Sequence, residues 1–149
     1  MGKYVPTVLV VIWVIIIFSF SFQDGDVSQG YSLKAASFLQ RSLGFIGDFD
    51  EDTLHYFVRK AAHVVLYFVL TLLVMNALHW GGFKGRGLVI RTLAISFFYA
   101  CMDEIIQRYV EGRSVKPQDV FIDGFGIILG IILGKILKIL LLKRVNREM

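Results

Sequence analysis

Apolar residues along the chain fall into four long runs, over residues 4–22, 58–78, 88–106 and 120–142. A helix of about 20 residues matches the roughly 30 Å hydrocarbon core of a bilayer, and each run is close to that length. We therefore predict an all-α, polytopic membrane protein with a bundle of four transmembrane helices. The second helix is predicted to begin before its apolar run, at about residue 52. Residues 1–149 are predicted to form one transmembrane domain.

The longest polar segment, residues 23–57, contains a helical pattern of its own. Its apolar residues recur at spacings of three and four, at Leu33, Ala36, Leu39, Leu43 and Ile46. This spacing predicts an amphipathic helix that lies along the membrane surface in the first outer loop. The acidic residues between Asp48 and Asp52 favour the start of the next helix, because carboxylates are stabilised at the positive end of the helix dipole.

Composition agrees with a membrane protein. Hydrophobic residues make up 56% of the chain and the mean hydropathy is +0.64, whereas soluble domains are about half apolar even with glycine counted. The net charge of +4 does not indicate nucleic-acid binding, because the basic residues lie in loops and tails beside apolar runs. Cys101 is the only cysteine, which excludes an intramolecular disulfide and a thiolate metal cluster.

The basic residues instead predict the orientation of the chain. Lys and Arg occur at the N-terminus, in residues 79–91 and in the C-terminal tail, while the first loop is acidic. Lys and Arg near the ends of spans favour the cytoplasmic side. Both termini are therefore predicted to be cytoplasmic, with residues 23–57 and 108–119 outside. The first apolar run is longer than a usual signal core and no small-x-small cleavage site follows, so it is predicted to stay as an anchor.

Three of the predicted helices carry a polar stripe. Residues four apart lie about 40° apart around a helix axis and so share a face. The stripes are Arg59, His63 and Tyr67; Tyr99, Asp103 and Gln107; and Asp119 and Asp123. Other polar residues at the same predicted outer level are Ser21, Gln23, Glu104 and Arg113. Ionisable residues within spans usually face the bundle interior and pair with one another, so we expect one shared pocket open to the outside.

The last stripe continues inward as a row of glycines at Gly126, Gly130 and Gly134. Small residues at this spacing let another helix approach closely. We therefore expect the carboxylate face of the fourth helix to be turned into the bundle.

These residues resemble a known family. The segments Arg59-Lys60-Ala61-Ala62-His63 with Tyr67, Asp103-Glu104-Ile105-Ile106-Gln107, Gly112-Arg113, Asp119, Asp123 and Gly126 are, in this order, similar to the VanZ family of small bacterial membrane proteins. A serine-glutamine signature of such proteins is represented by Ser21-Phe22-Gln23. The resemblance implies a four-span protein of the bacterial cytoplasmic membrane. The founding member is associated with low-level resistance to the glycopeptide teicoplanin, and members have been proposed to act on lipid head groups.

The leading hypothesis is a site at the outer leaflet of the membrane, in the cell envelope, that binds, and transfers or hydrolyses, a phosphate-bearing head group of a membrane lipid or a lipid-linked cell-wall precursor. Arginine binds phosphate in a bidentate manner and stays charged, which suits Arg59 and Arg113. Further candidates for substrate binding are Tyr67, Gln107 and Gln23. Lys60, one position round from Arg59, is expected to extend to the surface.

The candidate catalytic residues are His63, Asp103, Glu104 and Asp123. His63 could act as general base or nucleophile, because the pKa of histidine is near neutrality. The carboxylates could orient it or donate a proton. Asp119 and Asp123 could hold a divalent cation, and one histidine among several carboxylates favours Mg²⁺ or Mn²⁺ over zinc.

Three alternatives remain open. A non-catalytic module that holds a lipid or a cell-wall enzyme would need the arginines but not His63. The charged residues could also serve only to lock the helices together. A proton or ion pathway would need acidic residues through the membrane, whereas the inner halves of the predicted spans contain almost none.

Overall fold

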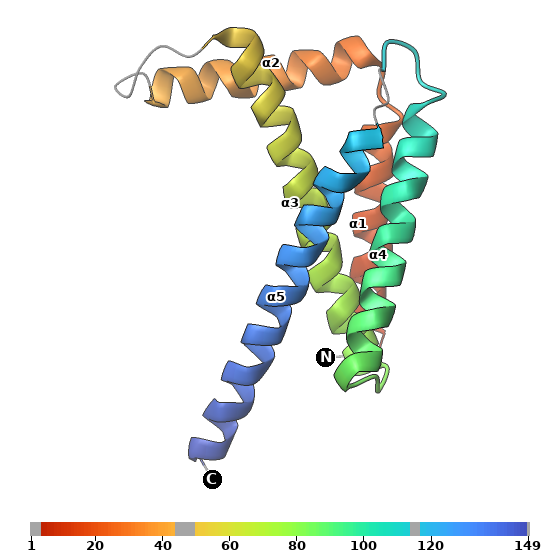
Figure 1. The fold of residues 1–149 in the computed structure, drawn as a ribbon, viewed down its shortest axis with the longest axis vertical. Helices are drawn as coiled ribbons and strands as arrows, with labels where there is room; N and C mark the ends of the chain where they lie inside the picture. The colour runs from red at the N-terminus through yellow and green to blue at the C-terminus, as the bar shows by residue number, and fades with distance from the viewer. Residues whose placement is uncertain (1–3, 44–49, 114–116, 149) are drawn as a thin grey trace.

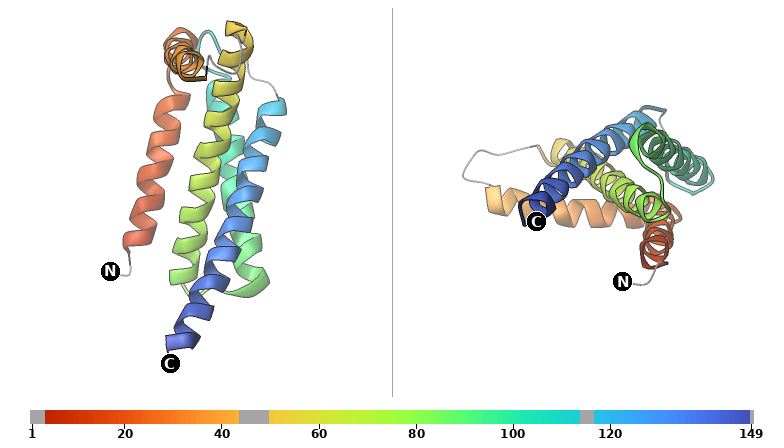
Figure 2. Two further views of the ribbon diagram at one scale, coloured as in Figure 1. Left: turned by 90° about the vertical axis from the view of Figure 1, so that its left-hand side faces the viewer. Right: turned by 90° about the horizontal axis from the view of Figure 1, so that it is seen from below.

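The computed structural model describes residues 4–43, 50–113 and 117–148, and all regular structure in these residues is helical (Figure 1). The helices are α1 (Val5–Ser21), α2 (Gly25–Leu43), α3 (Glu51–Trp80), α4 (Gly85–Gln107) and α5 (Pro117–Glu148). Four of them, α1, α3, α4 and α5, correspond to the four predicted runs. α2 crosses one end of the bundle, and the start of α1 and the end of α5 lie at the opposite end (Figure 2). The predicted all-α fold is confirmed.

Two helices are long and apolar enough to cross a membrane on their own. They are Asp52–Trp80 within α3 and Gln118–Leu140 within α5. α1 and α2 are related by a bend of 104°, and together they would count as a third candidate span. α1 alone has 17 residues, and α4 carries charged residues toward both of its ends. The four-span arrangement therefore stays a prediction.

Apolar side chains cover much of the exterior of the helices, and the interior holds polar side chains beside a buried apolar cluster. Large apolar side chains point outward along the helices, for example Ile15 on α1, Phe98 on α4 and Ile128 on α5, each more than half exposed. Polar side chains lie inside, and Thr92 and Asp123 are completely buried. An apolar exterior of this kind is typical of helices that lie in lipid.

α3 is the centre of the fold, because it packs against each of the other four helices and most extensively against α5. The glycines of α5 make the close packing possible. A Cβ atom at Gly126 would overlap the main chain of Val64, and one at Gly130 would lie 2.8 Å from Thr71 Cβ. Gly134 faces α3 in the same way, with Met75 as its neighbour. The close packing predicted for this row is confirmed.

The start of α2 is held against the loop that follows α4. The Gly25 N–H donates to the carbonyl oxygen of Glu111 at 3.0 Å. A Cβ at Gly25 would overlap the main chain of Gly112, so the two backbones are in direct contact. Gly112 has a φ of 71°, in the left-handed region that glycine adopts readily. This contact fixes α2 across the end of the bundle.

A helix is present where the amphipathic helix was predicted, and Ala36, one of its apolar positions, is buried. Its position on a membrane surface stays a prediction. The side chain of Leu43, and all of Ile46 and Asp48, lie outside the described residues.

Asp50 caps the N-terminus of α3. Its Oδ2 atom accepts hydrogen bonds from the Thr53 N–H at 3.0 Å and from the Thr53 hydroxyl at 2.9 Å. These bonds lower the pKa of Asp50 from its usual value, because they favour the charged carboxylate. The prediction that this acidic segment starts a helix is confirmed at Asp50.

Candidate functional site

A pocket of about 480 Å³ lies between α2 and the adjoining ends of α1, α3 and α4. Its charged and amide side chains are Gln23, Arg59, His63, Asp103, Gln107 and Arg113. Its apolar walls come mainly from α1 and α3, with Tyr31 and Ala35 from α2. The pocket therefore has a charged region next to a larger apolar region, and it collects six of the site residues predicted from the sequence.

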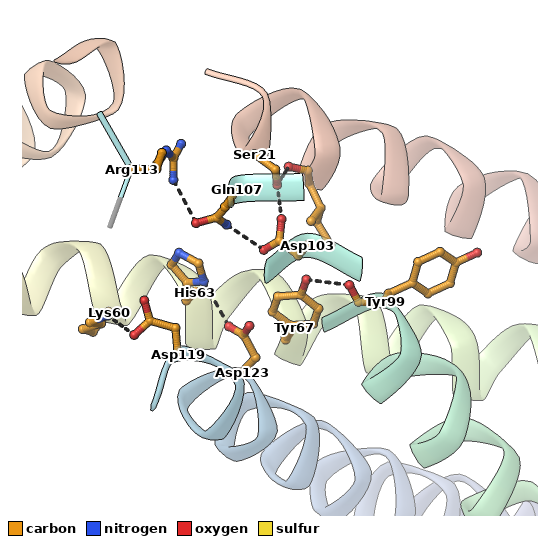
Figure 3. Close-up of polar contacts among 11 residues, drawn as sticks. Ser21, Lys60, His63, Tyr67, Tyr99, Asp103, Gln107, Arg113, Asp119 and Asp123 are labelled. Carbon is orange, nitrogen blue, oxygen red and sulfur yellow. Dashed lines mark hydrogen bonds and ion pairs between the residues drawn. The ribbon is translucent and has the colours of Figure 1, made fainter. Parts of the chain in front are cut away.

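Arg113 links the loop after α4 to α1. Its Nη2 atom donates to the Phe20 carbonyl oxygen at 2.7 Å, and its Nε atom donates to that of Gln23 at 3.2 Å. Its Nη1 atom donates to Gln107 Oε1 at 3.2 Å (Figure 3). Burial, together with the positive charge of Arg59, lowers the pKa of Arg113 from its usual value. The two guanidinium groups therefore lie close enough to repel each other.

Arg59 is half-buried and lines the same pocket. It has no hydrogen-bond or ion-pair partner within the described part of the chain. Arg59 lies four residues before His63 on α3, so the two side chains share one face of the helix, as the sequence predicted.

Asp103 is held from two helices. Gln107 Nε2, one turn further along α4, donates to Asp103 Oδ2 at 3.1 Å. The Ser21 hydroxyl, at the end of α1, contacts Asp103 Oδ1. Asp103 is only 2% exposed, so these contacts fix its orientation inside the bundle.

His63 and Asp123 form a pair between α3 and α5. His63 Nδ1 lies 3.0 Å from Asp123 Oδ1 (Figure 3). Asp123 is completely buried, whereas the His63 ring also lines the pocket. His63, Asp103 and Asp123 each offer one ligand atom, and these three atoms lie within 4.8 Å of one another. Side chains from α3, α4 and α5 thus converge, and together they could hold a metal ion.

Lys60 does not extend to the surface, so that expectation was wrong. It forms an ion pair with Asp119 across α3 and α5, and its side chain is 15% exposed. Close packing along the glycine row explains the pair: where Asp123 meets His63, Asp119 comes beside Lys60, one turn earlier on each helix. Asp119 is therefore paired with the ammonium group of Lys60. Asp123, the other predicted metal ligand, lies close to His63 and Asp103.

Besides Asp119 and Asp123, two further predicted site residues do not line the pocket. Tyr67 is completely buried, and its hydroxyl donates to the Tyr99 carbonyl oxygen on α4 at 3.3 Å. Glu104 is 6% exposed, and neither of its carboxylate oxygens has a hydrogen-bond partner in the described residues.

Two residues outside the predicted set also contribute, namely Ser21 and Lys60. The sequence placed Ser21 at the end of the first predicted helix, at the same level as the other polar residues, but it did not indicate the contact with Asp103. For Lys60 the available sign was that it lies about one helical turn before His63, as Asp119 lies about one turn before Asp123.

Apolar helix exteriors around a buried polar cluster define a helical membrane protein with a charged pocket at one end of its bundle. The sequence profile of the VanZ/LLP1 family matches residues 7–138, so the chain belongs to this family. The resemblance noted from the ordered motifs is confirmed. Comparisons with the curated proteins and with the solved structures found no match to this chain.

Proposed function

We propose that the pocket binds the phosphate-bearing head group of a membrane lipid or of a lipid-linked cell-wall precursor. The observation that carries this proposal is the presence of Arg59, without a hydrogen-bond or ion-pair partner among the described residues, beside Arg113 in one pocket. Two guanidinium groups brought together and partly removed from water are unfavourable unless an anion lies between them. Phosphate suits this position, because arginine binds its oxygens in a bidentate manner.

The apolar walls favour a lipid over a free anion. Ile17, Val58, Val65 and Leu66 line the pocket next to the arginines, and α2 covers it on one side. A head group could contact the arginines while the first part of an acyl or prenyl chain contacts these apolar side chains.

The link to teicoplanin that the family suggests would follow from action on a cell-wall precursor. Deletion of the gene, followed by measurement of teicoplanin susceptibility, tests this link.

The expected effect of Arg59→Gln is weaker binding of anionic lipid by about tenfold to hundredfold, the loss of one charge-assisted contact. Binding of phosphatidylglycerol and phosphatidylcholine to the purified protein in nanodiscs would be measured by native mass spectrometry. Arg108→Gln is the matched control, because Arg108 is exposed at the end of α4 and does not line the pocket. Equal losses in the two variants, or no preference of the wild type for the anionic lipid, would argue against the head-group site.

We further propose that all four long helices span a bacterial cytoplasmic membrane, with α2 on the outer surface and both termini in the cytoplasm. The position of the α1 start and the α5 end at one end of the bundle supports an even number of spans (Figure 2). The basic residues Arg86, Lys135 and Lys138 lie at that end, which suits the cytoplasmic side.

This orientation predicts a labelling pattern in the Cys101→Ser background, which removes the one native cysteine. Gly30→Cys on α2 should react with a membrane-impermeant maleimide in intact cells, because a side chain there meets nothing within 4 Å. Lys84→Cys, in the turn between α3 and α4, should react only after the cells are opened. The reverse pattern would refute the proposed orientation, and equal labelling of both in intact cells would contradict the four-span arrangement.

A catalytic role is supported by the His63–Asp123 pair at the pocket wall. In the proposed hydrolysis, the free ring nitrogen of His63 takes a proton from a water molecule, whose oxygen attacks the phosphorus. The bond from phosphorus to the leaving oxygen breaks, and the proton on His63 passes to that oxygen. Asp123 would orient the imidazole and stabilise its protonated form. Transfer follows the same steps with an alcohol in place of water.

The non-catalytic alternative is a lipid-binding module or a partner of a cell-wall enzyme. It uses the same pocket and the same arginines. The two functions separate at His63, because binding alone does not require a proton acceptor.

A further inference from the structure

We propose that His63, Asp103 and Asp123 form a site for one divalent cation, Mn²⁺ or Mg²⁺, inside the bundle. These residues come from α3, α4 and α5, and their ligand atoms already lie within 4.8 Å of one another. Ligands of Mg²⁺ lie about 2.1 Å from the ion, so only a small inward movement of these side chains is needed. One imidazole with carboxylate oxygens suits Mn²⁺, which accepts both kinds of ligand, and Mg²⁺, which prefers oxygen.

Buried carboxyl oxygens without hydrogen-bond partners favour a cation at this place. Asp123 is 0% exposed, and its Oδ2 atom has no hydrogen-bond partner in the described residues. Glu104, next to Asp103 on α4, is 6% exposed and has both oxygens unpartnered there. It interacts electrostatically with His63, Asp103 and Asp123, so its carboxyl group lies near the same centre. Buried carboxyl oxygens without partners are costly, and a cation would supply the contact they lack.

The charge balance supports the same conclusion. Of the four buried carboxyl groups in this region, only that of Asp119 is paired with a lysine, Lys60. Arg113 donates to two carbonyl oxygens and to Gln107, and to no carboxylate among the described residues. Asp103, Glu104 and Asp123 therefore form no ion pair with a lysine or arginine in the described residues. A divalent cation would offset the repulsion among these carboxylates.

The surroundings also resemble the outer shell of a metal site. Ser21 and Gln107 each contact one oxygen of Asp103, which fixes the carboxylate while leaving lone pairs for an ion. Such contacts around a ligand typically orient it and strengthen metal binding. An imidazole that binds an ion does not also accept a proton from water, so in the ion-bound form the ion would activate the water in place of His63. Any such part of the ion in head-group chemistry rests on the proposed function, but ion binding itself does not, so the two can fail separately.

The test is a titration of the full-length protein with Mn²⁺ in detergent, without added lipid, followed by electron paramagnetic resonance. The wild type should bind about one Mn²⁺ ion per chain, so that the signal of free Mn²⁺ falls, in line with a single three-residue ligand set. Excess Mg²⁺ should displace the bound Mn²⁺. Asp103→Asn and Asp123→Asn should each weaken binding by at least tenfold. The control is the double variant Lys60→Gln with Asp119→Asn, which removes the neighbouring ion pair without changing the net charge and should bind Mn²⁺ as the wild type does.

Pulsed electron paramagnetic resonance on the wild type gives a second test, which does not depend on how the variants fold. Coupling between bound Mn²⁺ and the nitrogen of isotope-labelled histidine should be present, and His63→Gln should abolish it. If the folded wild type did not bind Mn²⁺, the proposed site would be overturned. Protonation of the carboxyl groups would then be the remaining explanation for how their repulsion is removed. Equal loss in the control and in Asp123→Asn, or binding without histidine coupling, would overturn the assigned ligands.

Discussion

His63→Ala is expected to lower the rate of head-group release by about 10²–10⁴-fold, the usual contribution of a general base. The reason is geometric: His63 is the side chain that both lines the pocket and pairs with a fully buried carboxylate, Asp123. Asp123→Asn should lower the rate as well, because it leaves the imidazole without the anion that stabilises its protonated form. Both variants should still bind anionic lipid, since Arg59 and Arg113 are unchanged.

The measurement is the release of labelled head group from phospholipid or from a lipid-linked cell-wall precursor by purified protein. Arg108→Gln serves as the control for purification and folding, because it lies outside the pocket. Equal product from wild type and His63→Ala would assign the activity to a contaminant. No product from any of them, with lipid binding intact, would favour the non-catalytic module.

Gly126→Ala is expected to destabilise the protein by about 1–3 kcal/mol, the usual range for an overpacked core. Its new methyl group would overlap the main chain of Val64, and a backbone cannot turn aside as a flexible side chain can. α3 and α5 would have to separate, which would also move Asp123 away from His63. Unfolding in mixed micelles, followed by circular dichroism, measures the free energy difference.

The matched control is Gly124→Ala on the same helix. A Cβ there meets nothing within 4 Å, so the change should be neutral or stabilise the helix by up to about 1 kcal/mol. If the two alanine variants were equally stable, close contact along the glycine row would not be what holds α3 and α5 together.

The sequence predicted the parts of the fold that depend on local pattern. Apolar runs placed four of the helices, and the spacing of Gly126, Gly130 and Gly134 predicted the close packing later found against α3. Helical spacing of four also brought Arg59 and His63 to one face, and the pocket collects both.

Features that depend on long-range geometry could not be predicted in the same way. The sharp bend between α1 and α2 and the wall that α2 forms rely on the contact of Gly25 with Gly112, far apart in the chain. The Lys60–Asp119 pair depends on the register between α3 and α5, which no single-helix pattern encodes. Tyr67 shares the stripe of His63, yet its hydroxyl meets a main-chain carbonyl of α4, because the helices pack closely below the pocket.

The central claim is that a lipid phosphate lies between the two guanidinium groups of one pocket. Solid-state NMR can test it through the dipolar coupling between ³¹P of a bound anionic lipid and ¹⁵N in the arginine side chains of the protein in bilayers. We predict coupling from guanidinium nitrogens that weakens in Arg59→Gln and is unchanged in Arg108→Gln. No coupling in the wild type, or coupling that survives Arg59→Gln and disappears in Arg108→Gln, would contradict the account.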